Sequence, residues 1–109
     1  MEHLHPLSDY LGEFFRVLRP GGLLVGAIPC EGGLAWGGGR LLTTRRYIRK
    51  HSGINPDKII CWEHPNYAEH ILQSLACRFE PLRVRFWPLK VPLVDCNLIC
   101  SFLYRKGIA

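Results

Sequence analysis

The sequence predicts an α/β fold built on a small sheet, and three observations lead to that prediction. An amphipathic helical pattern ends in the Arg-Pro-Gly-Gly segment at residues 19–22. The unbroken apolar run Leu23–Ile28 follows directly, as in a strand covered on both faces of a parallel sheet. Two segments near the C-terminus have the composition of further strands. A helix that leads into a buried strand is half of an α/β crossover unit.

The first helix is expected over Ser8–Leu18. Ser8 is a suitable N-cap, and Asp9 and Glu13 suit the first turns. Pro20 cannot continue a helix, and the two glycines after it allow the positive-φ reversal of a sharp helix end. The apolar stripe of this helix consists of Leu7, Tyr10, Leu11, Phe14 and Leu18.

The middle of the chain predicts one short helix and one longer one. Residues 29–39 are glycine-rich and are expected to be irregular, with Trp36 embedded in them. A short basic helix begins at Thr43 or Thr44, runs through His51 and ends at Ser52-Gly53. Residues 54–65 are interrupted by prolines and predict a loop. A second substantial helix, Asn66–Cys77, follows with Asn66 as its cap.

Two strands complete the predicted sheet. Leu82–Trp87 alternates apolar and polar side chains, which indicates a strand with one face in water. Leu98–Tyr104 is largely apolar and is expected to be buried. Strands this close in sequence usually pair antiparallel, so a hairpin should end the chain.

The N-terminal third carries a pattern that resembles the class I S-adenosylmethionine-dependent methyltransferases, in their small-molecule branch. In that family the pattern surrounds the fourth helix and the fifth strand. The matching residues here are Glu2-His3, Leu11, Glu13, Arg16-Val17-Leu18, Pro20-Gly21-Gly22, Leu24 and Pro29. Further along the chain the resemblance rests on the order of elements alone.

The resemblance implies the C-terminal half of a Rossmann-like methyltransferase sheet. The expected fold is α/β with three strands, the last two an antiparallel hairpin, two main helices and one short helix. Residues 1–109 would form a single partial domain. The family binds S-adenosylmethionine through a glycine-rich turn after its first strand and an acidic residue ending its second. This sequence supplies neither, and Gly37-Gly38-Gly39 follows no strand and lacks the GxGxxG spacing.

The family's strand order implies a sheet running first strand, third strand, second strand. Leu23–Ile28 would then have a partner on one side only, leaving an apolar edge open to another chain. We therefore expect a homo-oligomer or pairing with a separate N-terminal half through this edge. S-adenosylmethionine would serve the complete enzyme, and this chain alone would not bind it tightly.

Ligands of open α/β sheets bind beyond the carboxyl ends of the strands. Through the resemblance, Glu2 and His3 would border the cofactor, and His3 would position or deprotonate the methyl acceptor. A local helix-start role is the alternative for His3. The residues expected to border a small-molecule acceptor are His5, Pro29, Glu31 and Trp36. Glu31 would act as a base or bind a cationic acceptor, or it would be an ordinary exposed loop carboxylate.

A formal net charge of +5 is compatible with a nucleic-acid partner. A solvated basic helix face also explains this charge, and the sequence contains no nucleic-acid-binding motif, so a nucleic-acid partner is not expected. No apolar run approaches the ~20 residues that span a bilayer, and no basic-then-apolar leader is visible, so a cytoplasmic protein without a membrane is expected. The basic residues are Arg40, Arg45, Arg46, Arg49, Lys50, Arg78, Arg83 and Arg85.

The five cysteines predict neither a disulfide framework nor a metal site, because they are scattered without a C-x-x-C pair. Cys96 and Cys100 would share a strand face about 13 Å apart, too far for a bridge or a shared zinc ion. Buried structural thiols are expected. His64 and His70 lack metal-ligand spacing, and Trp62, like Trp36, serves either a substrate stack or the core.

Three functional hypotheses remain. The first is a partial methyltransferase with substrate-side elements. The second is a non-enzymatic oligomerising remnant that acts through its open edge. The third is a small basic nucleic-acid-binding module that uses the Arg40–Lys50 cluster.

Overall fold

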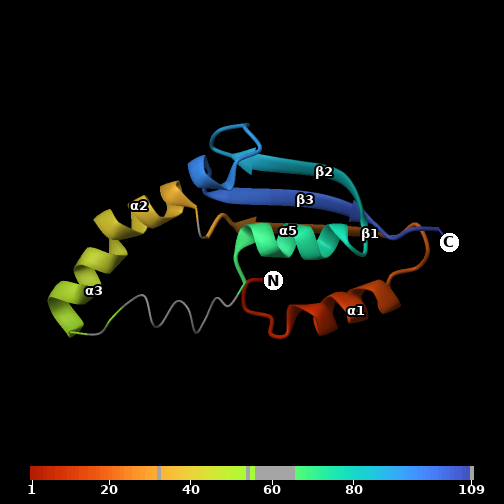
Figure 1. Cartoon of the computed structure of the whole chain (residues 1–109), viewed down its shortest axis with the longest axis horizontal. Coiled ribbons are helices and arrows are strands. Elements are labelled where there is room, and N and C mark those ends of the chain that lie inside the picture. The colour runs from red at the N-terminus through yellow and green to blue at the C-terminus, as the bar shows by residue number, and fades with distance from the viewer. Residues whose placement is uncertain (32, 54, 56–65, 109) are drawn as a thin grey trace.

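The computed structural model of the chain describes residues 1–31, 33–53, 55 and 66–108. Within these ranges the fold is mixed α/β, with a three-stranded open sheet and four α-helices (Figure 1). The elements are α1 (Leu7–Val17), β1 (Leu23–Pro29), α2 (Leu34–Leu42), α3 (Thr44–Ser52), α5 (Ala68–Ala76), β2 (Glu80–Trp87), a 3-10 turn η1 (Val94–Cys96) and β3 (Ile99–Arg105). The predicted loop at residues 54–65, including Trp62 and His64, lies outside the described residues except for Asn55.

The sheet has the order β1-β3-β2, which confirms the predicted strand order. β3 lies in the centre and pairs antiparallel with both neighbours. The final hairpin is therefore also confirmed. Since β1 and β2 are each antiparallel to β3, they run parallel to one another and their carboxyl ends meet at the same end of the sheet.

The predicted α1 is confirmed within one residue at each end, but its cap is different. Pro6 occupies the N-cap position, no side chain caps the helix, and the Ser8 hydroxyl donates to Asp9 Oδ1 instead, at 3.4 Å. At the other end, Lys106 Nζ donates to the carbonyls of Phe15 (2.6 Å) and Leu18 (2.8 Å). A lysine from the end of β3 thus satisfies carbonyls that a helix C-terminus leaves unpaired.

The predicted second helix is present as the shorter α5, which begins after Tyr67 rather than at Asn66. Asn66 does not cap it. Its side-chain amide instead donates to the carbonyls of Met1 and Leu4, and its backbone N–H donates to the carbonyl of Glu2. Asn66, which is 5% exposed, therefore fixes the N-terminal segment against the start of α5.

The core lies between one face of the sheet and the helices α1 and α5. Even-numbered residues of β3 point into it, and Cys100, Phe102 and Tyr104 are all buried. The helices contribute Leu7, Leu11, Ile71 and Leu75, and β1 contributes Ile28. Figure 1 shows α5 lying along the strands with α1 beside it. Of the apolar stripe predicted for α1, Leu7 and Leu11 are buried, but Tyr10 is 43% exposed.

The other face of the sheet is uncovered by any described element, which corrects the expectation for β1. Leu23 is 53% exposed and Val25 72% exposed, so this strand is not covered on both faces. The unbroken apolar sequence arises because alternate side chains enter the core and the rest lie on an open apolar surface. We call this surface the open face; its large apolar members are Leu23, Val25, Trp87 and Ile99.

β1 is also an edge strand within the described part of the chain. Cys30 N–H donates to Leu98 O, and Lys106 N–H donates to Gly22 O, so even-numbered residues of β1 bond to β3. The backbone N–H and C=O groups of Leu23, Val25 and Ala27 consequently point away from the sheet. The open edge that the strand order implied is present.

Residues 34–42 form the helix α2 and not the irregular segment that their glycines predicted. The prediction was wrong because three consecutive glycines lower helix propensity but do not forbid a helix that neighbours support. The N–H of Leu34 donates to Asp95 Oδ1 at 3.3 Å, and Gly33 lies so close to Val94 that a Cβ would be 2.6 Å from its carbonyl. Contact with η1 thus fixes the start of α2.

The basic helix α3 has the predicted extent and ends at Gly53 in the left-handed region (φ 63°). Thr43 occupies the predicted N-cap, but its hydroxyl donates back to Gly39 O at 2.8 Å. Figure 1 shows α2 and α3 projecting from the end of the sheet as an arm. The radius of gyration, 15.9 Å, exceeds the ~13 Å of a compact domain of this length.

Within the described ranges, no helix combines the length and apolar character required to cross a bilayer.

Gly26 is where β1 approaches the core most closely, and we predict that Gly26→Ala destabilises the protein. A Cβ there would lie 2.5 Å from the Phe102 ring, which is 3% exposed and cannot move without displacing Tyr104. The expected loss is about 1–3 kcal/mol in the free energy of unfolding, measured by urea titration. Gly38→Ala is the control: it meets nothing within 4 Å in α2 and should stabilise by about 0.5–1 kcal/mol. Equal stability of the two variants would contradict this packing.

Candidate functional site

The carboxyl ends of β1 and β2 form the end of the sheet where a ligand is expected. Pro29, Ile99 and Trp87 lie in one row across the three strands at this end. The arm of α2 and α3 leaves the sheet here, and the N-terminus lies beside the start of α5 (Figure 1). The segments predicted to border the site are residues 2–5 and 29–32, of which Gly32 lies outside the described residues. Asn66 holds the first segment, and pairing with Leu98 holds Cys30 in the second.

Glu2 and His3 lie together, with His3 Nε2 3.8 Å from Glu2 Oε1. The second Glu2 oxygen accepts from the α-amino group of Met1 at 3.1 Å. Burial alone would raise the pKa of Glu2, but its hydrogen bonds and the nearby positive charges outweigh burial and lower the pKa. The His3 side chain is 57% exposed, so this histidine is accessible to a bound molecule.

His5 lies in a groove between the start of α1 and α5. The groove has a volume of about 550 Å³, and His70 and Asn66 are on its α5 side. The structure thus brings His5 to the same groove as His70, which the sequence did not suggest. This groove is on the helix-covered side of the sheet.

Glu31 is buried, with 3% of its surface exposed, and follows the fully buried Cys30. It is therefore not the exposed loop carboxylate that the sequence also allowed. Pro29 ends β1, and the N–H of Cys30 donates to Leu98 O at 2.8 Å, which extends the pairing with β3 beyond the strand.

Trp36 lies on α2 and not in an irregular segment. Arg40 is one turn further along the same helix. The indole Nε1 of Trp36 and one terminal nitrogen of Arg40 are buried, and neither has a hydrogen-bond partner among the described residues. Buried donors of this kind usually have a partner. Both donors lie on the same side of α2 and are shielded from solvent.

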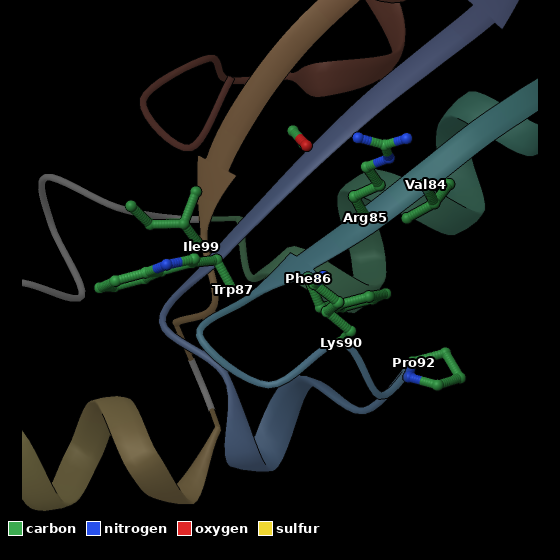
Figure 2. Close-up of a pocket in the computed structure, with 8 residues that line it drawn as sticks. Val84, Arg85, Phe86, Trp87, Lys90, Pro92 and Ile99 are labelled. Carbon is green, nitrogen blue, oxygen red and sulfur yellow. The ribbon is translucent and has the colours of Figure 1, made fainter.

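A further cavity lies on the open face, and sequence reasoning did not identify it. Its volume is about 710 Å³, and Figure 2 shows the residues around it. Arg85, Trp87, Ile99 and Ser101 line it from the open face of the sheet, and Lys90 and Pro92 line it from the loop after β2. Val84 and Phe86, the alternate residues of β2, complete the lining. The available signal was the position of Arg83, Arg85 and Trp87 at alternate residues of β2, but this alternation predicted only a strand with one face in water.

The basic cluster is divided between the helices and β2. Arg46, Arg49 and Lys50 line a cavity of about 480 Å³ on α3 together with Leu42. On the same helix Tyr47 stacks on His51, with ring centroids 4.4 Å apart. The helix is accordingly basic and largely exposed, as the solvated-face interpretation expects.

The described cysteines are all free, and two of the four are buried. Cys96 lies in η1 and Cys100 in β3, so the prediction that they share one strand face was wrong. Burial, with a smaller effect of Cys30, raises the pKa of Cys100 to about 11, and burial also raises the pKa of Cys30. Among the described residues, no group of three or more possible ligands could hold a metal ion.

These thiols should differ in reactivity, because the thiolate is the reactive form. With iodoacetamide at pH 8, we predict that the exposed Cys77 is alkylated first, whereas Cys30 and Cys100 remain protected. Raising the pH toward 11 should accelerate Cys100 as its thiolate forms. Peptide mass spectrometry measures each site, with urea-unfolded protein as the control in which all sites react. Native Cys100 reacting as fast as Cys77 would be inconsistent with its burial.

Comparisons of the chain with protein-family models, with curated proteins and with solved structures find no match.

Proposed function

We propose that this chain is the substrate-side part of a class I S-adenosylmethionine-dependent methyltransferase, and that it requires a cofactor-side half to act. The observation that carries the proposal is the sheet. The strand that follows the family-like Arg-Val-Leu-Arg-Pro-Gly-Gly segment is an edge strand, and the final hairpin inserts its last strand beside it. A Rossmann-like sheet would continue from the free side of this strand.

The placement of the helices supports the same proposal. α1 and α5 cover one face of the sheet, and the open face exposes large apolar side chains such as Val25. Doubly wound sheets carry helices on both faces. A second set of elements, supplied by another chain or segment, would cover this surface and complete the fold.

The residues that the structure describes do not form a complete cofactor site. The run Gly37-Gly38-Gly39 lies within α2, where its backbone N–H groups are engaged in a helix rather than arranged as a phosphate-type loop. Glu2 and His3 could border a cofactor but cannot enclose one. The chain's own contribution would be to orient a small-molecule acceptor, since methyl transfer depends mainly on alignment of the reacting groups.

For the acceptor, the proposed roles are divided between two segments. His3 is accessible and would take a proton or orient the acceptor, while Pro29 and Trp36 would line its site beyond β1. His5 faces a separate groove with His70, so it is the weakest of the proposed acceptor contacts.

A non-enzymatic oligomer is the second candidate, and the edge of β1 favours it. Leu23, Val25 and Ala27 carry no charge and direct their backbone groups outward, and no bulge or lysine blocks the edge. Antiparallel pairing of two copies centred on Val25 would align Leu23 with Ala27 of the other copy. Two sheets would then join around a twofold axis.

The isolated chain should not bind S-adenosylmethionine detectably, because the cofactor-side elements are absent from it. In calorimetry we expect any dissociation constant to be weaker than about 1 mM. A complete class I methyltransferase measured in parallel is the positive control. Micromolar affinity of the purified chain would refute the proposed division between the two halves.

The edge of β1 should mediate association, so Val25→Lys should convert an associated chain into a monomer in light scattering coupled to gel filtration. A lysine at an edge strand opposes strand pairing. Ser101→Lys is the matched control, because Ser101 is on the same open face but in the central strand. It should leave an edge-mediated assembly intact. A wild-type chain that is monomeric at all concentrations would contradict association through this edge.

A further inference from the structure

We propose that the cavity on the open face binds a small organic anion with a flat apolar body. The inference concerns the residues around β2 and β3 and does not depend on the methyltransferase proposal. It assigns the positive charges of Arg85 and Lys90 to the head group of the ligand and the surface of Trp87 to its body.

Pairing between β2 and β3 positions the sheet part of the cavity. Arg85 lies opposite Ser101, and Trp87 lies opposite Ile99, so these four side chains share the open face in two adjacent rows. The end of the hairpin is fixed, because Leu98 N–H donates to Trp87 O at 2.8 Å. The guanidinium, the hydroxyl and the indole are therefore presented from paired strands, whose relative positions are set by backbone hydrogen bonds.

The charge in the cavity is entirely positive among the residues that line it. Arg85 and Lys90 are both present and no carboxylate is. Glu80, the acidic residue of β2, binds Arg105 at 2.7 Å, at the opposite end of the strand. Arg85 therefore presents a guanidinium without an acidic partner in the described part of the chain, and this group recognises carboxylate or phosphate with paired hydrogen bonds.

The apolar part of the cavity suits a flat group. Trp87 is 59% exposed and Ile99 44% exposed, which leaves a large aromatic surface and an aliphatic side chain in water on the face that carries Arg85. Figure 2 shows these two side chains next to each other at one side of β2, with Lys90 near Phe86 in this view and Pro92 further along the loop. An aromatic ring bearing an acidic group would cover the indole while its charge contacts Arg85.

The dimensions favour a small molecule over a polymer. A volume of about 710 Å³ lies within the range of sites for small organic ligands, roughly 300–1,000 Å³. The strongest run of positive charge lies elsewhere, on α3, so a nucleic acid would be expected at that helix instead.

The test is calorimetry of the full chain with 2-naphthoate at low salt, where charge pairing is least screened. Three further probes separate the contributions: neutral 2-naphthamide, acetate, and 2-naphthyl phosphate. We expect binding of 2-naphthoate or 2-naphthyl phosphate, the tighter of the two identifying the head group, and at least tenfold weaker binding of 2-naphthamide and of acetate.

Arg85→Gln should weaken 2-naphthoate binding about tenfold, as expected for losing a hydrogen bond to a charged group. Arg83→Gln is the matched control, since Arg83 is on the same strand and face but does not line the cavity. Lys90→Gln is a second variant, because Lys90 lies in the loop after β2, where the substitution should not affect folding. Circular dichroism verifies folding of each. Equal binding by the Arg85 and Arg83 variants, equal binding of 2-naphthamide, or no binding of either naphthyl anion would overturn the proposal.

Discussion

The central position of β3 is the constraint on which the rest of this structure depends. β3 pairs with β1 on one side and β2 on the other, so it fixes which side chains of all three strands enter the core. The helices α1 and α5 pack against the buried residues of β3, which are Cys100, Phe102 and Tyr104. Lys106, just beyond the strand, then holds the end of α1 through two carbonyls. The last strand in the sequence thus organises the first helix and the first strand.

The same arrangement explains why the molecule has an open face and an open edge. Among the described elements, helices cover one side of the sheet and β1 has a neighbour on one side. Val25, which lies on both the open face and the free edge, is among the most exposed apolar residues of the chain. The cavity around Arg85 and Trp87 lies on the same face, so a partner that covered the entire face would compete with a ligand in that cavity.

Local sequence predicted the elements in which a residue's neighbours along the chain decide its conformation. The Pro-Gly-Gly turn, the left-handed Gly53 and the apolar stripe of α1 are of this kind, and each was placed within a residue or two. Two of the errors concern residues whose partners are distant in sequence. Asn66 holds the N-terminal segment rather than capping α5, and α2 is supported by η1 despite its three glycines.

For the candidate site, the sequence by itself determined the residue types at the ends of the strands. These residue types led to the prediction that Glu2–His5 and Pro29–Gly32 border a ligand. Only the tertiary structure decided that Glu31 is buried, that His5 shares a groove with His70, and that Arg85 and Trp87 line a cavity. Alternation along a strand says which side chains share a face. Whether another layer covers that face depends on elements far away in the chain, and no local pattern contains that information.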